Sequence, residues 1–177
     1  GNGKVLVCMG GADPQSYTTK ILEQIVFSHE KYSGHLAVSE IKVIIGAAFT
    51  DYEALKSVAD STNLNVSIFL SPANIPELML TSDLCILSCG TMILEACALG
   101  VPSIGVVVAD NQQGTADFLD KAGAIKLYDF KSEVDPNIYA TMSSLVNDTE
   151  RLSAYSAKLK TMVSSASNET IARNLYE

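Results

Sequence analysis

The chain has 177 residues, of which 47% are hydrophobic and 18% are charged, and its formal net charge is −8. This composition predicts a globular domain and excludes a disordered chain, while the acidic balance argues against nucleic acid or an anionic membrane as the main partner. No apolar run is long enough to cross a bilayer, and no signal peptide is recognisable. We therefore expect a cytoplasmic protein without a membrane span.

Apolar runs alternate with helical patterns as far as Tyr128. The predicted strands are 4–9, 41–45, 66–70, 84–87, 103–108 and 125–128. The predicted helices are 17–28, 52–61, 75–80, 92–99, 112–122, 136–146, 150–165 and a last one from 169. Because the strands are continuously apolar, we expect an α/β fold, a Rossmann-like doubly wound parallel sheet of about six strands with helices on both faces, in a single domain over residues 1–177.

Small polar residues precede the first three helices and are candidate N-caps. Ser16 or Thr18 is predicted to cap the first helix, Thr50 or Asp51 the second, and Asn74 the third. Each of these helices follows a strand, so its first turn lies at the carboxyl edge of the sheet, where ligands of doubly wound folds bind.

The first candidate site is the turn Gly10-Gly11-Ala12-Asp13, between a strand and a helix. Two glycines let a ligand approach the backbone closely, and the free N–H groups of a helix start favour an anion such as phosphate. The alternative is a plain strand-to-helix turn. Neither G-x-G-x-x-G nor G-K-[ST] is present, so the sequence predicts neither an NAD fingerprint nor a P-loop.

The second candidate site is the turn Ser88-Cys89-Gly90-Thr91, with Glu95 in the apolar helix that follows. If Thr91 is the N-cap, Glu95 lies one position too late for a capping box. Its apolar neighbours predict a helix that is buried on most sides, where an unpaired carboxylate is costly and a sugar diol would supply the missing donors. The alternative is that Glu95 lies on an exposed strip of the helix.

The third candidate site is the polar run from Asp110 to Gln113, directly after an apolar strand. Amides such as Asn111 and Gln112 are suited to reading hydroxyl groups at this edge, although helix capping would account for one or two of these side chains. No catalytic group is expected. His29 and His35 fall near the end of the first helix, at the opposite edge of the sheet, and Cys89 has no partner histidine.

No metal and no cofactor are expected, because no cluster has metal-ligand spacing. The four cysteines form no C-x-x-C pair and are expected to be free, mostly buried thiols; they are Cys8, Cys85, Cys89 and Cys97.

These motifs together resemble the C-terminal, nucleotide-sugar-binding domain of GT-B proteins, over about Val5 to Gly123. The resemblance rests on MGGADP, on SCGTMILEACALGVPSI and on ADNQ. The pattern is most similar to the pseudaminic-acid-pathway UDP-sugar hydrolases, also known as spore-coat polysaccharide proteins, which release UDP from UDP-2,4-diacetamido-2,4,6-trideoxy-β-L-altropyranose. It is also similar to the lipid II-forming glycosyltransferase, which has one more residue between its glycine and glutamate.

The resemblance implies a role for each matching position. Glu95 would bind the ribose hydroxyls of UDP, and backbone N–H groups would hold the diphosphate. The turn after the third strand would hold the uracil, and two amides would read the sugar. The implied binding residues are Gly10, Gly11, Ala12, Asp13, Ser71, Asn74, Ile75, Cys89, Gly90, Thr91, Glu95, Asn111 and Gln112.

The resemblance also implies that half of the enzyme is missing, because the catalytic histidine of the hydrolases belongs to an N-terminal domain without a counterpart here. The leading hypothesis is the C-terminal half of a UDP-sugar hydrolase in surface polysaccharide or flagellin glycan synthesis. One alternative is the donor half of a UDP-sugar glycosyltransferase, and another is a non-catalytic subunit that completes a site with a partner chain. In each case this chain would bind a UDP-sugar and would not turn it over by itself.

Overall fold

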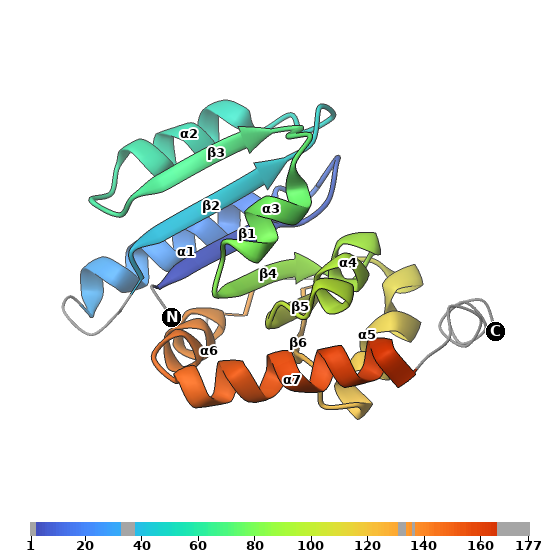
Figure 1. Cartoon of the computed structure of the whole chain (residues 1–177). Helices are drawn as coiled ribbons and strands as arrows, with labels where there is room; N and C mark the ends of the chain where they lie inside the picture. Colours follow the sequence, from blue (N-terminus) through green and yellow to red (C-terminus); the bar gives the residue numbers. More distant parts are fainter. Residues whose placement is uncertain (1–2, 33–37, 131–133, 136, 166–177) are drawn as a thin grey trace.

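The computed structural model describes residues 3–32, 38–130, 134–135 and 137–165 (Figure 1). Its sheet has six parallel strands in the order β3-β2-β1-β4-β5-β6. The strands are β1 Lys4–Cys8, β2 Glu40–Ile45, β3 Val66–Leu70, β4 Leu84–Ser88, β5 Ser103–Val107 and β6 Lys126–Asp129. The predicted doubly wound sheet is confirmed. The strand order reverses between β1 and β4, which is where such folds bind ligands.

The helices connect the strands and follow the last one. They are α1 Tyr17–Lys31, α2 Tyr52–Asp60, α3 Ile75–Leu80, α4 Thr91–Leu99, α5 Gln113–Lys121, α6 Ile138–Val146 and α7 Thr149–Ser165, with a short 3₁₀ helix η1 at Asp110–Gln112. The helix predicted from residue 169 lies outside the described residues. None of the described helices is both long and apolar enough to cross a membrane.

The strands divide their side chains between two hydrophobic clusters, one on each face of the sheet. Along β1, Val5 and Val7 pack with α1, α2 and α6, whereas Leu6 and Cys8 pack with α3, α4 and α5. Figure 1 shows α3 and α4 on one side of the sheet and α1 and α2 on the other. This alternation within one continuously apolar strand is expected of a parallel sheet covered on both faces.

The cap of α1 differs from the prediction. Ser16 occupies the N-cap position, but its φ is 53° and its side chain makes no capping hydrogen bond. Asp13 caps the helix instead, because its carboxylate accepts the N–H groups of Tyr17 at 3.0 Å and Thr18 at 2.7 Å. Asp51 and Asn74 do occupy the predicted N-cap positions of α2 and α3, although neither side chain makes a capping bond.

Candidate functional site

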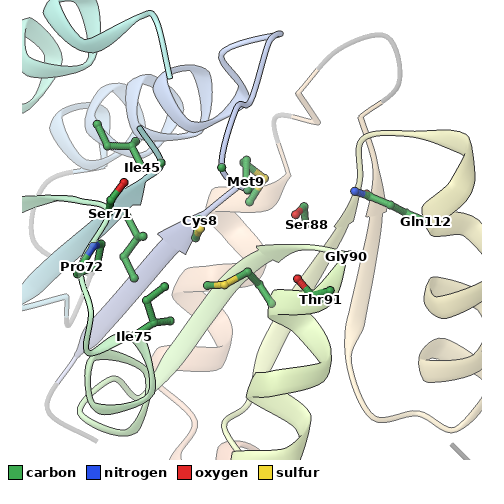
Figure 2. Close-up of a pocket in the computed structure, with 15 residues that line it drawn as sticks. Cys8, Met9, Ile45, Ser71, Pro72, Ile75, Ser88, Gly90, Thr91 and Gln112 are labelled. Carbon is green, nitrogen blue, oxygen red and sulfur yellow. The ribbon is translucent and has the colours of Figure 1, made fainter. Parts of the chain in front are cut away.

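A cleft of about 510 Å³ opens at the carboxyl edge of the sheet, beyond the ends of the paired strands β1 and β4 (Figure 2). It is formed by the ends of β1, β2 and β4, by the turns after these strands and after β3, by the first residues of α3 and α4, and by η1. The lining residues are Cys8, Met9, Gly10, Gly11, Ile44, Ile45, Gly46, Ser71, Pro72, Ile75, Ser88, Gly90, Thr91, Met92 and Gln112.

The structure brings seven of the predicted binding residues together in this cleft: Gly10, Gly11, Ser71, Ile75, Gly90, Thr91 and Gln112. Three others are exposed and lie outside the lining set, namely Ala12, Asn74 and Asn111. Each of them is directly next to a lining residue in the chain, so the predicted turns reach the cleft even where the individual residue is not part of the wall.

Asp13 has a structural role instead of the predicted contact with ligand. Its side chain is buried, and both carboxylate oxygens accept backbone N–H groups of α1. The anion site that the sequence predicts at the start of α1 is therefore filled by the protein's own carboxylate. Gly10 and Gly11 still line the cleft, so this turn contributes backbone rather than a helix N-terminus.

Cys89 also lies outside the lining set. Its backbone N–H donates to the carbonyl oxygen of Val106 at 2.8 Å, so it extends the β4–β5 ladder and is not available to a diphosphate. The side chain is buried, and burial raises the pKa of the thiol to about 12. A thiol with that pKa is protonated at neutral pH and is a poor nucleophile.

Glu95 is exposed, which corrects the prediction of a helix buried on most sides. Only Ile93, Ala96 and Cys97 of α4 have buried side chains, so the cost of burying an unpaired carboxylate does not arise. The carboxylate nevertheless lies near the cleft. The pKa of the Cys8 thiol is raised to about 11, mainly by burial and to a lesser extent by the negative charges of Asp13 and Glu95, against a lowering by a hydrogen bond to the backbone of Gly10. Because Glu95 follows Thr91 by four residues, it lies on the same side of α4 as that lining residue, one turn further from the cleft.

The N-terminus of α4 faces the cleft without a side-chain cap. Its N-cap is Gly90, which has no side chain to accept the first N–H groups, and the first turn contains no acidic residue. The first four N–H groups of an α-helix have no partner within the helix. Because Gly90, Thr91 and Met92 line the cleft, α4 directs these donors and the positive end of its dipole into it.

Gln112 presents a fixed amide group opposite α4. Its Oε1 accepts the backbone N–H of Val108 at 3.0 Å, so the orientation of the amide is set by the protein. Its Nε2 points toward Gly90 in Figure 2, and a Cβ atom added to Gly90 would lie 3.8 Å from it. The two N–H donors of this amide therefore face the same space as the start of α4.

Eight lining residues are not among the binding residues implied by the sequence, although Ser88 belongs to the second candidate turn: Cys8, Met9, Ile44, Ile45, Gly46, Pro72, Ser88 and Met92. Most of them are the last residues of apolar strands or follow them directly. They could have been predicted from the topology, because the carboxyl ends of neighbouring parallel strands meet at one edge of a sheet. Gly46 has a further role, since a Cβ atom placed on it would lie 2.2 Å from the carbonyl oxygen of Gly11. The turns after β1 and β2 are therefore in direct contact.

Comparison with known families identifies this arrangement. Residues 5–173 match the sequence profile of the Glycosyltransferase family 28 C-terminal domain. The chain belongs to this family. A curated relative is the UDP-N-acetylglucosamine–N-acetylmuramyl-(pentapeptide) pyrophosphoryl-undecaprenol N-acetylglucosamine transferase of Listeria welshimeri, 30% identical over 118 residues. Another is an uncharacterized protein of Methanocaldococcus jannaschii, 29% identical over 102 residues.

The family 28 domain spans only part of these relatives. The Listeria match covers 63% of this chain and 32% of the relative, and the Methanocaldococcus match covers 56% and 20%. Among solved structures, MurG of Acinetobacter baumannii has a TM-score of 0.71 at 17% identity, over 91% of this chain and 46% of that protein. A spinosyn rhamnosyltransferase complexed with thymidine diphosphate has a TM-score of 0.66 at 20% identity, over 98% and 45%. These likenesses establish a shared fold.

The comparisons correct the order of the functional hypotheses. The family is named for glycosyltransferases, and one of the solved structures of the same fold is a rhamnosyltransferase. The reading that the sequence analysis gave as an alternative, the C-terminal domain of a glycosyltransferase, is therefore better supported than the hydrolase of the pseudaminic acid pathway.

Proposed function

We propose that this domain binds the nucleoside diphosphate part of a UDP-sugar for glycosyl transfer. The observation that carries this proposal is the uncapped N-terminus of α4, which opens into the cleft at the switch point of the sheet. A helix N-terminus with free N–H groups is an anion site, and a diphosphate is the anion that a nucleotide sugar brings. The name of the Listeria relative specifies a UDP-sugar donor, in agreement with this proposal.

The remaining parts of the ligand fit the surrounding groups. The diphosphate is held by the N–H groups at the start of α4, and the amide of Gln112 donates to the sugar or to a phosphate oxygen. The exposed carboxylate of Glu95 accepts the ribose hydroxyls. The turn with Ser71 and Ile75 forms the wall on the β3 side and receives the base. Two proteins of the same fold were crystallised with thymidine diphosphate and with UDP.

Catalytic groups are expected to come from outside this domain. None of the described residues that line the cleft is a carboxylate, histidine, lysine or arginine. The one thiol in the lining, Cys8, has a pKa raised to about 11 by burial and is no base at neutral pH. We therefore infer that an N-terminal half or a partner chain binds the acceptor and supplies the catalytic base.

Replacing Glu95 with alanine is expected to weaken UDP binding about ten- to a hundredfold, because hydrogen bonds to a charged group contribute roughly 1.5–3 kcal/mol. Calorimetric titration of this chain with UDP measures the change. The matched control is Glu23→Ala, which removes another exposed glutamate, from α1, outside the cleft. Equal UDP affinities for the two variants would remove Glu95 from the site.

Product analysis with the protein of the complete reading frame tests the reaction. The proposal predicts that UDP is released from a UDP-sugar only when a hydroxyl acceptor is added. Release of UDP and free sugar without an acceptor would support the hydrolase instead, the reading based on the spacing of Gly90 and Glu95. Activity that requires a separately encoded chain would support the third reading, a non-catalytic subunit.

A further inference from the structure

A buried lysine lies beneath α3, on the face of the sheet that carries α4 and α5. Lys42, in the middle of β2, is only 5% exposed. Within the described part of the chain, no carboxylate forms an ion pair with it. Its partners are instead the last residues of α3 and the turn that follows. Burying an ammonium group among neutral oxygen atoms costs free energy unless its N–H groups are hydrogen-bonded. The contacts that offset this cost show which segment Lys42 holds.

The ammonium group of Lys42 is surrounded by four oxygen atoms from one short segment. Its three N–H groups are shared among the carbonyl oxygens of Leu78 at 3.4 Å and Thr81 at 3.0 Å and the hydroxyls of Thr81 at 2.7 Å and Ser82 at 3.4 Å from Nζ. The last carbonyl groups of a helix accept no hydrogen bond from N–H groups of the same helix, and a cation near them interacts favourably with the helix dipole. Burial lowers the pKa of this lysine, which is consistent with its enclosure.

The other end of the same helix forms part of the cleft. α3 spans only Ile75–Leu80, and Ile75 lines the cleft together with Ser71 and Pro72 of the preceding turn. So short a helix is not stable by itself, so its position depends on what holds it to the sheet. Ile44, two residues after Lys42 and on the same face of β2, also lines the cleft. Lys42 therefore holds the far end of α3, and Ile44 lies below its near end.

From this arrangement we propose that Lys42 is a positioning residue, which anchors α3 so that the turn from Ser71 to Ile75 is set to receive the base of the nucleotide. This inference rests on the proposed function, because it assigns the base to that turn. Lys42 does not touch the ligand. Its role is to fix the wall against which a pyrimidine is selected.

The test replaces Lys42 with methionine, which keeps an unbranched side chain that is one atom shorter and removes its hydrogen bonds. UDP and ADP share ribose and diphosphate and differ only in the base, so the ratio of their affinities reports on the base site alone. We expect this chain to prefer UDP, and Lys42→Met to lose at least fivefold of that preference. Thr81→Val removes one of the four acceptors and is expected to have a smaller effect in the same direction, which keeps the test available if Lys42→Met does not fold.

The matched control is Met142→Ala, in α6 on the opposite face of the sheet, where the side chain is fully buried. It is expected to lower the melting temperature while leaving the ratio of UDP to ADP affinities unchanged. If folded Lys42→Met or Thr81→Val keeps the wild-type ratio, the positioning role is wrong, although the proposed function stands. If the wild-type chain binds neither nucleotide, the proposed function itself fails.

Discussion

Replacing Gly90 with aspartate is expected to reduce UDP affinity a hundredfold or more while the protein stays folded. Gly90 has a φ of −93°, which any residue adopts, and the nearest atoms to an added Cβ lie at 3.8 Å and 4.0 Å. An aspartate at an N-cap accepts the N–H groups of the first turn. The new carboxylate would then occupy the anion site, as Asp13 does at α1, and two unit charges 4 Å apart repel by about 4 kcal/mol near a protein surface.

Gly90→Asn is the matched control for this substitution, because asparagine caps the helix with the same shape and without the charge. We expect Gly90→Asn to bind UDP more weakly than the wild type and clearly better than Gly90→Asp, with similar melting temperatures for the two variants. The difference in UDP affinity between the two variants reports the repulsion between the new carboxylate and the negative charge of the bound group. If Gly90→Asp binds UDP within threefold of the wild type, the diphosphate does not lie at α4.

Gly46→Ala is expected to distort the cleft from its other side. The added Cβ would lie 2.2 Å from the carbonyl oxygen, 2.5 Å from the Cα and 2.7 Å from the carbonyl carbon of Gly11. All three are backbone atoms and cannot rotate away, so the turn that begins at Gly10 must move. Overpacking of this kind costs roughly 1–3 kcal/mol, which for a chain of this size lowers the melting temperature by about 2–12 °C. UDP affinity should fall tenfold or more, because the displaced turn lines the cleft.

Gly114→Ala provides the control for Gly46→Ala. Gly114 lies in α5, and an added Cβ there meets nothing within 4 Å. Alanine in a helix is favoured over glycine by about 0.5–1 kcal/mol, so we expect unchanged or slightly higher stability and unchanged UDP affinity. A Gly46→Ala variant that melts and binds UDP as the wild type does would show that the contact between the two turns does not shape the site.

The sheet was predictable because its strands are uninterrupted apolar runs between turn residues. Each strand begins and ends within one residue of its predicted bounds, for example 66–70 for β3. Helix ends were less predictable, since α1 continues to Lys31, three polar residues beyond its predicted end at residue 28. Nothing in an exposed last turn of a helix distinguishes it from a loop in sequence, because neither buries an apolar side chain.

The edge of the sheet that carries the site was also predictable, whereas the hydrogen bonds and the exposure of individual side chains there were not. A sequence shows that Asp13 and Cys89 are in the turns, but not that the carboxylate of Asp13 reaches the start of α1 or that the N–H of Cys89 pairs with Val106. The exposure of Glu95 depends on which side of α4 meets the sheet. An almost wholly apolar helix gives no pattern from which to read that side.

The most direct test of the account is a titration of this chain with UDP, followed through the backbone amide signals by NMR. We expect the largest shifts at Gly11, Gly46, Gly90 and Thr91, around the cleft. The cavity between α1 and α6, lined by Lys31 and Ser143 among others, provides the internal reference and should not respond. Saturable shifts confined to that second cavity, or no shifts at millimolar UDP, would contradict the proposal that α4 and its neighbouring turns hold the nucleotide.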